Sequence, residues 1–200
     1  MYSGALSPMA DVILEGEFVT LRPLSVDDAS LTLAWRQSAR AANLNAAPQC
    51  LEQQAKWIST RPDSEYNFVI ELKDGRPVGM VSLTGIDITH GRAEPGRFLI
   101  GDEEAVRGVP VAVEAMKLVY ELAFVKLGLQ RVHGSVASDN VLMIKWQKFM
   151  GMTEEGRLRN HYFINGKFQD AVIFGLLAEE YRVRAKPKMD VFIKAARKTN

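Results

Sequence analysis

Residues 105–116, AVRGVPVAVEAM, combine the residue types that bind an anion at the start of a helix. Arg107 supplies a positive charge, Gly108 permits a tight turn, and the next residues have helical apolar spacing. The first amides of a helix have no partner within it, and together with the helix dipole they attract negative groups. Pro110 has no N–H to donate, and proline is also common at an ordinary helix start. These residues alone leave both interpretations open, an anion-binding turn and a helix that begins at a proline.

Motifs for other kinds of chemistry are absent from the sequence. There is no GxxxxGK[ST], no GxGxxG after a strand pattern, and no GxSxG. Three histidines, His90, His133 and His161, and the single cysteine lack the spacing of zinc ligands. The sequence therefore predicts neither a metal site nor covalent catalysis.

Composition predicts one domain that works without nucleic acid or membrane. The chain has 200 residues, 47% of them hydrophobic, and a net charge of +1. A balanced charge gives no reason to expect a nucleic-acid or anionic-membrane partner. Cys50 is the single cysteine, and neither a signal peptide nor a membrane-spanning apolar run is visible. We expect a cytoplasmic protein.

The pattern of apolar residues predicts the order β-α-α-β-β-β-α-β-α-β-β, a mixed α/β sheet with helices on both faces. Lys73-Asp74-Gly75 and Asn165-Gly166 predict hairpin turns. Glu114 is expected to face outward from the helix that follows residue 110. The predicted domain covers residues 12–181, with a loose arm at 1–11. Residues 182–200 form a basic tail, either solvated or an arm that binds a partner or makes a dimer.

From residue 107 onward the chain resembles the GNAT superfamily of acetyl-CoA-dependent N-acetyltransferases. The family motif is Gln or Arg, two residues, Gly, one residue, then Gly or Ala, where a loop meets a long helix. Here it spans Arg107 to Ala112, with Pro110 in place of the glycine. The resemblance covers about residues 12–181 and leans toward the branch of ribosomal-protein and nucleotide-amino-sugar acetyltransferases. Further positions that match are Asn140, Gly151, Glu155, Gly156 and Asp170.

The resemblance implies a central mixed, largely antiparallel sheet of about seven strands flanked by four helices. It also implies acetyl-CoA as co-substrate and no metal. The pyrophosphate is expected over residues 107–112, and the pantetheine arm along the splayed strand at 97–101. The residues expected to bind acetyl-CoA are Leu99, Ile100, Arg107, Gly108, Val109, Val111, Ala112, Asn140 and Gln147.

For catalysis the resemblance assigns Glu94, in AEPG, as general base, with His90 and then Asp87 as reserves. Relatives often place a serine or a tyrosine as general acid where this chain has Met143 and Gln147. A thiol with a pKa near ~8.5 leaves passably without an acid, but the departure keeps a non-catalytic acyl-CoA-binding module open as an alternative.

The expected acceptor is the primary amine of a nucleotide-linked amino sugar. Trp35 and Arg36 of LAWRQS, with Arg159 and His161 of RNHYFINGKFQD, are the expected acceptor-binding residues. Guanidinium groups suit a nucleotide diphosphate, whereas a cationic peptide N-terminus would be repelled by them. Acetylation of a protein N-terminus stays open as the alternative, and a homodimer is compatible with the resemblance.

Overall fold

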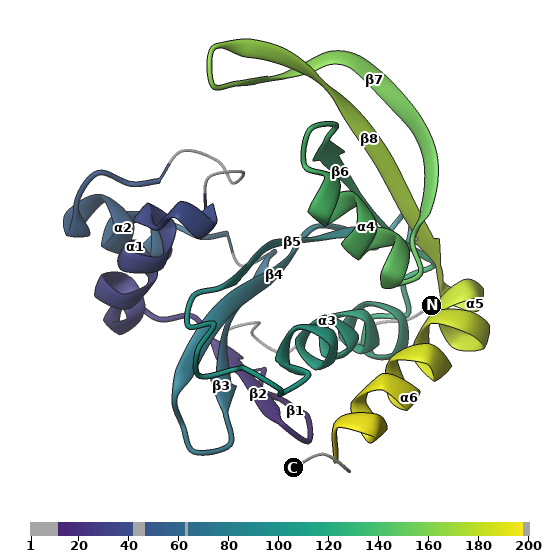
Figure 1. The fold of residues 1–200 in the computed structure, drawn as a ribbon, viewed down its shortest axis with the longest axis horizontal. Helices are drawn as coiled ribbons and strands as arrows, with labels where there is room; N and C mark the ends of the chain where they lie inside the picture. Colours follow the sequence, from purple (N-terminus) through teal and green to yellow (C-terminus); the bar gives the residue numbers. More distant parts are fainter. Residues whose placement is uncertain (1–11, 42–46, 63, 198–200) are drawn as a thin grey trace.

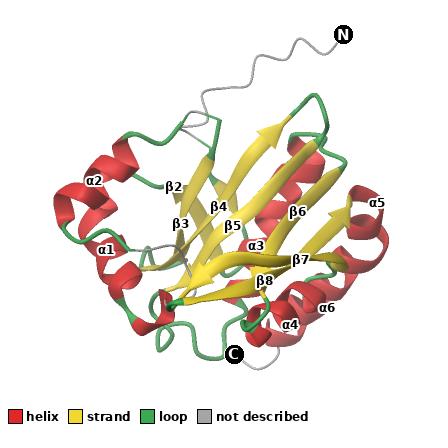
Figure 2. Ribbon diagram, turned by 90° about the horizontal axis from the view of Figure 1, so that it is seen from above, coloured by secondary structure: helices red, strands yellow, loops and turns green. Residues whose placement is uncertain are grey.

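The computed structural model describes residues 12–41, 47–62 and 64–197. Its centre is an eight-stranded sheet in the order β1-β2-β3-β4-β5-β6-β8-β7 (Figures 1 and 2). Neighbouring strands are antiparallel, except that β5 and β6 are parallel. The strands are β1 Leu14–Glu15, β2 Val19–Pro23, β3 Tyr66–Leu72, β4 Pro77–Asp87, β5 Arg92–Ile100, β6 Arg131–Ala137, β7 Thr153–Ile164 and β8 Lys167–Leu177.

The helices lie on both faces of this sheet, as the alternation of apolar residues along β4 and β5 requires. Met80 and Leu99 pack with Trp35 of α1, while their neighbours Val81 and Ile100 belong to the main core beside α3. Successive side chains of a strand point to opposite faces, so α1 and α2 cover one face and α3 the other. The helices are α1 Ala29–Gln37, α2 Leu51–Ser59, α3 Val111–Glu121, α4 Val141–Phe149, α5 Ala178–Glu180 and α6 Lys186–Arg197.

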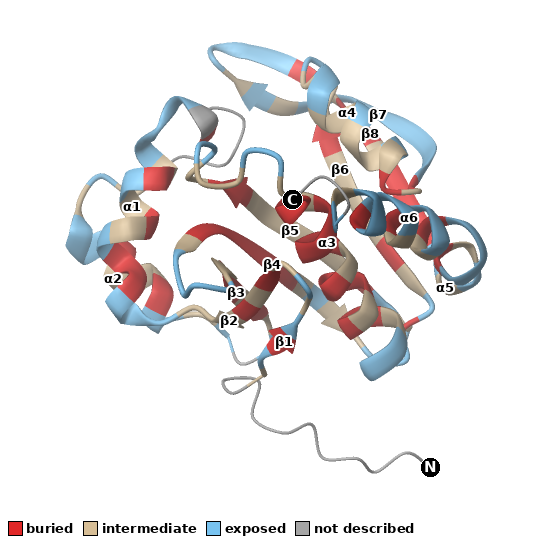
Figure 3. Cartoon of the chain, turned by 60° about the horizontal axis from the view of Figure 1, so that its bottom comes forward, coloured by how far each residue is buried: buried red, intermediate tan, exposed pale blue. Residues whose placement is uncertain are grey.

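Burial separates the well-packed half of the sheet from the long β7–β8 hairpin. In Figure 3 the strands β3 and β4 and much of α3 are buried, whereas β7 is exposed along most of its length. This hairpin arches away from the rest of the sheet (Figure 1). Its turn has positive φ at Asn165 (51°) and Gly166 (77°), which confirms the type I′ turn that Asn-Gly predicts.

The parallel strands β5 and β6 diverge soon after they begin. They pair at Arg92 with Arg131 and at Ala93 with Val132, and no further pairing joins them. The register between β4 and β5 also shifts, and Arg97 has a φ of 49° in the middle of β5. An irregularity of this kind turns a strand away from its neighbour. The result is an opening in the sheet toward the carboxyl ends of β5 and β6.

The C-terminal segment corrects the predicted domain boundary at residue 181. Residues 182–197 are not a solvated tail: a π-helical turn at Tyr181–Ala185 leads into α6, whose Met189 and Ile193 are 1% and 5% exposed. These two residues stand four apart and form an apolar stripe among lysines and arginines. Lys117 of α3 pairs with Asp190 at 2.5 Å. Residues 1–11 and 198–200 lie outside the described residues.

Glu114 of α3 is also placed differently from the expectation that it faces outward. Its side chain is buried and accepts hydrogen bonds from the backbone N–H groups of Glu17, Phe18 and Val19 at 2.7, 2.7 and 2.9 Å. The turn between β1 and β2 leaves these amides without strand partners, and a buried amide needs an acceptor. Glu114 therefore fixes α3 to the first two strands.

Candidate active site

The start of α3 provides amides that have no partner within the helix, next to a positive side chain. Pro110 is the N-cap residue, and the first helical bond runs from the Glu114 N–H to the Pro110 carbonyl at 3.0 Å. The amides of Val111, Ala112 and residue 113 precede that bond, so they can donate to a ligand. Pro110 precedes these three residues, so its lack of an N–H removes none of the three donors.

The loop before α3 supplies fewer donors than the sequence suggested. Gly108 has a φ of 79°, the left-handed conformation that favours glycine, and Arg107 is exposed. The N–H of Val109 donates to the Val106 carbonyl at 3.0 Å, and the N–H of Arg107 points back to Glu104 at 3.3 Å. Among the loop residues named above, the Arg107 side chain and the Gly108 amide are the groups that can meet an anion.

In the part of β5 that diverges from β6, the backbone is the group available to a ligand, because the side chains at the end of the strand are in the core. Leu99 and Ile100 are both buried. Beyond Ala93 the edge of β5 that faces β6 has no strand partner among the described residues, so its N–H and C=O groups are open to a ligand.

Across this opening lies α4, which carries the two residues predicted on the β6 side. Asn140 is the N-cap of α4, and its side chain accepts from the Met143 N–H at 3.1 Å, while Gln147 is partly buried. Phe98 of β5 stacks on Trp146 of α4 at 5.8 Å. The Trp146 Nε1–H is buried without a hydrogen-bond partner among the described residues. This donor is missed by sequence reading because Trp146 belongs to an apolar helix stripe.

Glu94 lies where β5 leaves β6. It follows Ala93, the last residue paired to β6, and it pairs with Thr84 of β4 on the face covered by α1 and α2. A carboxylate oxygen lies 3.9 Å from the position that a Cβ on Gly134 of β6 would take. No hydrogen bond or ion pair to this carboxylate occurs within the described part of the chain, so it is available to accept a proton.

His90, the reserve base, lies just before the amino end of β5. It belongs to the turn between β4 and β5, where β5 and β6 are still paired, and its side chain is 68% exposed. Its Nδ1 lies 2.8 Å from an oxygen of Asp87. Hydrogen bonds from the His90 backbone and ring lower the pKa of Asp87. This position gives no support to a catalytic role for His90 or Asp87.

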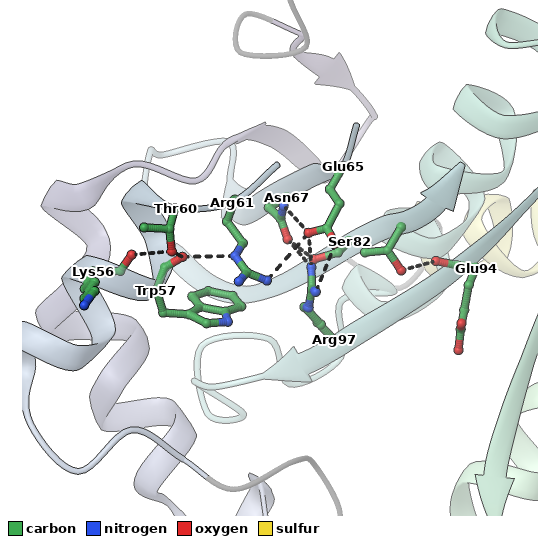
Figure 4. A network of polar contacts seen from close by, with 10 residues as sticks. Lys56, Trp57, Thr60, Arg61, Glu65, Asn67, Ser82, Glu94 and Arg97 are labelled. Carbon is green, nitrogen blue, oxygen red and sulfur yellow. Dashed lines mark hydrogen bonds and ion pairs between the residues drawn. The ribbon is translucent and has the colours of Figure 1, made fainter. Parts of the chain in front are cut away.

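A polar network that sequence reading missed occupies the face covered by α1 and α2 (Figure 4). Arg97 donates from Nη1 to Glu65 at 2.7 Å and to Asn67 at 2.8 Å, and from Nη2 to Glu65 at 3.3 Å. The hydroxyl of Ser82 donates to the same Asn67 oxygen at 2.8 Å. The one signal in the sequence is the polar Asn67 inside an apolar strand.

The guanidinium groups of two arginines lie over the ring of Trp57 in α2. The Cζ atoms of Arg61 and Arg97 lie 4.4 and 5.5 Å from the centre of its ring. Burial and the charge of Arg97 lower the pKa of Arg61 and of Arg36, which places Arg36 near this cluster. Burial opposes ionisation of Glu65, but its bonds with Arg97 outweigh that effect and lower its pKa.

The other predicted acceptor residues are not brought together. Trp35 is 7% exposed, and its ring packs on the backbone of Gly101, so Trp35 supports the end of β5 from the core. This burial leaves Trp35 little surface for contact with an acceptor. Arg159 and His161 are exposed on β7, on the β6 side of the opening, whereas Arg36 is on α1.

A cleft of about 250 Å³ lies elsewhere, between the β1–β2 turn, α3 and α6. It includes neither Glu94 nor the start of α3, and its charged groups pair with one another, as Lys117 does with Asp190. In the described residues, no helix is long and apolar enough to cross a membrane, and no group of three potential metal ligands occurs.

Comparisons with known proteins identify this arrangement. The family model described as an acetyltransferase (GNAT) domain matches residues 19–153. The spermidine N(1)-acetyltransferase of Escherichia coli (strain K12) is 30% identical over 131 residues, which are 66% of this chain and 68% of that protein. A prophage-derived N-acetyltransferase of Bacillus subtilis (strain 168) is 25% identical over 178 residues, 88% of this chain and 98% of the other.

Solved structures share the fold. A GCN5-related N-acetyltransferase from Brucella melitensis superposes with a TM-score of 0.77 at 23% identity, covering 90% of this chain and 84% of that one. Mutant forms of the spermidine/spermine N-acetyltransferase from Vibrio cholerae give a TM-score of 0.71 at 24% identity, covering 84% of this chain and 99% of the other. The chain belongs to the GNAT acetyltransferase family and is an acetyl-CoA-dependent N-acetyltransferase.

Proposed function

We propose that this enzyme acetylates the primary amine of a small molecule in the opening between β5 and β6, with Glu94 as general base. The observation that carries the proposal is the position of the Glu94 carboxylate, unpartnered within the described part of the chain and facing Gly134 where the strands diverge. A protonated amine must lose a proton before it attacks a thioester, and a carboxylate at that point can take it directly or through water.

The residues at the start of α3 fit the phosphates of acetyl-CoA. The amides of Val111, Ala112 and residue 113, the helix dipole and the Arg107 guanidinium together favour a pyrophosphate. Leu99 and Ile100 would bind the pantetheine arm through their backbone, and the buried Trp146 N–H is a further donor. The Asn140 side chain already caps α4, so its part is to hold the helix that carries Gln147.

Binding of acetyl-CoA is tested separately from turnover. At a hundred times its dissociation constant, acetyl-CoA stabilises the fold by about 2.7 kcal/mol, which raises the melting temperature by roughly 5–10 °C. Arg107→Glu places a negative charge beside the pyrophosphate and should remove most of this shift. An unchanged shift in Arg107→Glu would show that the phosphates bind elsewhere.

The transfer step needs positioning more than special groups. The amine nitrogen forms a bond to the thioester carbon, the carbonyl oxygen takes negative charge, and the C–S bond then breaks. Free N–H groups on the open edge of β5 can stabilise that oxygen. Met143 and Gln147 provide no strong acid on α4. A thiol with a pKa near ~8.5 leaves as thiolate without one.

For the acceptor we propose a nucleotide-linked amino sugar, supported by the arginines that gather beside α2. The second candidate is a polyamine, because relatives are named spermidine acetyltransferases. The test is thiol release from acetyl-CoA with UDP-linked 4-amino sugars, spermidine and short peptides. Turnover of an amino sugar supports the proposal; turnover of spermidine or peptides alone overturns this choice of acceptor. Acetyl-CoA binding with no turnover of any amine would indicate a non-catalytic module.

A further inference from the structure

We infer that Arg61 and Arg97, stacked on Trp57, form a subsite for an oxyanion carried by the acceptor. The inference rests on the proposed function, since the acceptor amine then lies at Glu94 and the negative group lies toward α2. The expected acceptors are amines that also bear a carboxylate or a phosphate. The two arginines would determine which acceptor binds, without taking part in the transfer step.

One edge of the Arg97 guanidinium is fully hydrogen-bonded, and the other edge has donors to spare. Both Nη1 hydrogens and one Nη2 hydrogen are used by Glu65 and Asn67. A guanidinium has five N–H donors. The Nε–H and the second Nη2–H, which share one edge, therefore have no partner among the described residues. The side chain is 26% exposed, so this edge can receive a planar oxyanion through two parallel bonds.

Arg61 has donors to spare as well. Its Nε donates to the Trp57 carbonyl at 3.0 Å, and its Nη1 lies 3.7 Å from Glu65, beyond hydrogen-bonding distance. No hydrogen bond from its terminal nitrogens occurs in the residues that the structure describes. Both guanidiniums lie over the same indole ring, which holds them within reach of one ligand group.

The charges of this cluster favour an anion over a cation. Two guanidiniums share the single carboxylate of Glu65. The charge of Arg97 adds to burial in lowering the pKa of Arg61, so the two arginines repel one another. An oxyanion between them relieves that repulsion, whereas a second ammonium group of a polyamine increases it. The subsite therefore selects against polyamines such as spermidine, for which the spermidine acetyltransferases are named.

The subsite is held rigidly on the strand that carries Glu94. Arg97 has a φ of 49°, a left-handed conformation that a non-glycine residue keeps when its contacts fix it. Those contacts are the bonds to Glu65 and to Asn67, which Ser82 holds in turn. Glu94 stands three residues earlier on β5. The inference requires the acceptor to extend along β5 from Glu94 to Arg97.

The test uses three amines of equal chain length on the CoA-loaded protein: n-butylamine, 4-aminobutanoate and 1,4-diaminobutane. Dissociation constants are measured by ligand-observed NMR, which does not depend on turnover. We expect 4-aminobutanoate to bind about 10- to 100-fold tighter than n-butylamine, and 1,4-diaminobutane to bind more weakly than either. Adding 3-aminopropyl phosphate distinguishes a phosphate-binding subsite from a carboxylate-binding one.

Two variants assign the preference to this subsite. Arg97→Asn removes the guanidinium and keeps a residue that tolerates positive φ, and Arg61→Gln removes the second charge without touching β5. Each should abolish most of the preference for 4-aminobutanoate. Arg76→Gln, in the exposed turn between β3 and β4, is the matched control and should keep it. Equal binding of the three amines, or an unchanged preference in both variants, would overturn the inference.

The outcome also separates this inference from the proposed function. A preference for 4-aminobutanoate without acetylation of any amine means that the subsite exists and the catalytic proposal fails. Acetylation of all three amines at similar rates, with similar dissociation constants, means that the catalytic proposal holds and the subsite does not exist.

Discussion

Replacement of Glu114 by glutamine tests how α3 is fixed in the fold. The carboxylate accepts three backbone N–H groups, Oε1 from Glu17 and Oε2 from Phe18 and Val19. Gly16 lies so close that a Cβ there would stand 2.6 Å from the Glu114 Cδ. Glutamine has the same shape but one acceptor oxygen in place of two.

The expected loss follows from these bonds. The glutamine oxygen can keep the bonds from Phe18 and Val19, but its amide nitrogen then faces the N–H of Glu17. One charge-assisted bond, about 1.5–3 kcal/mol, is lost, and two others become neutral bonds of about half that strength. Two of the three amides are only partly buried, so water recovers part of the loss. We expect Glu114→Gln to lower the free energy of unfolding by about 2–4 kcal/mol.

Urea and thermal unfolding measure this change. In a chain of this size the melting temperature should fall by roughly 5–15 °C. The matched control is Glu121→Gln on the same helix, which loses a partly exposed pair with Lys186 and should cost less than about 1 kcal/mol. If Glu114→Gln is no less stable than Glu121→Gln, the bonds to the β1–β2 turn do not hold α3 as described.

Two further predictions concern the helix start and acid stability. Pro110→Gly adds an amide at the N-cap of α3 and should tighten CoA binding while lowering the free energy of unfolding by about 0.5–1 kcal/mol; unchanged or weaker CoA binding, measured by calorimetry, would show that the ligand does not reach the N-cap. Burial raises the pKa of Asp28, but bonds from Arg22 and Ser25 outweigh it, and the pKa is lowered in the folded state. The stability that Asp28 contributes is therefore present above its unfolded pKa of about 3.9 and is lost as the pH falls through the folded value. Asp28→Asn should be less stable than wild type at pH 7, and its free energy of unfolding should fall less on acidification below about pH 4. Urea midpoints that change equally with pH in the two proteins would contradict this.

Sequence reasoning succeeded where the signal is local. The Asn165-Gly166 turn and the helix that begins after Pro110 both follow from short stretches of residues. It failed at α6 because two apolar positions, Met189 and Ile193, were outweighed by the basic residues on either side of them. Burial of a stripe depends on a partner helix, which composition does not reveal.

The candidate site was predictable only where its residues belong to a local motif. Glu94 was found through a resemblance that fixes its place at the start of a strand, and the structure puts it where β5 and β6 diverge. Arg61 and Glu65 lie in one short segment, but Arg97 comes from β5 and meets them only in the folded sheet. Glu114 was misplaced because an acidic residue on a helix is usually exposed, and its backbone partners lie 95 or more residues away.

The role of Glu94 as the base is tested most directly by the pH dependence of amine acetylation in Glu94→Gln. With n-butylamine as acceptor, the variant should turn over about 10²- to 10⁴-fold more slowly than wild type at pH 7, with acetyl-CoA binding unchanged. Because an alkylamine has a pKa near ~10.4, the gap should narrow as the pH rises toward that value and the amine loses its proton in solution. A variant that matches the wild-type rate at pH 7, or a gap that stays constant at all pH values, would contradict the assignment of Glu94 as the base.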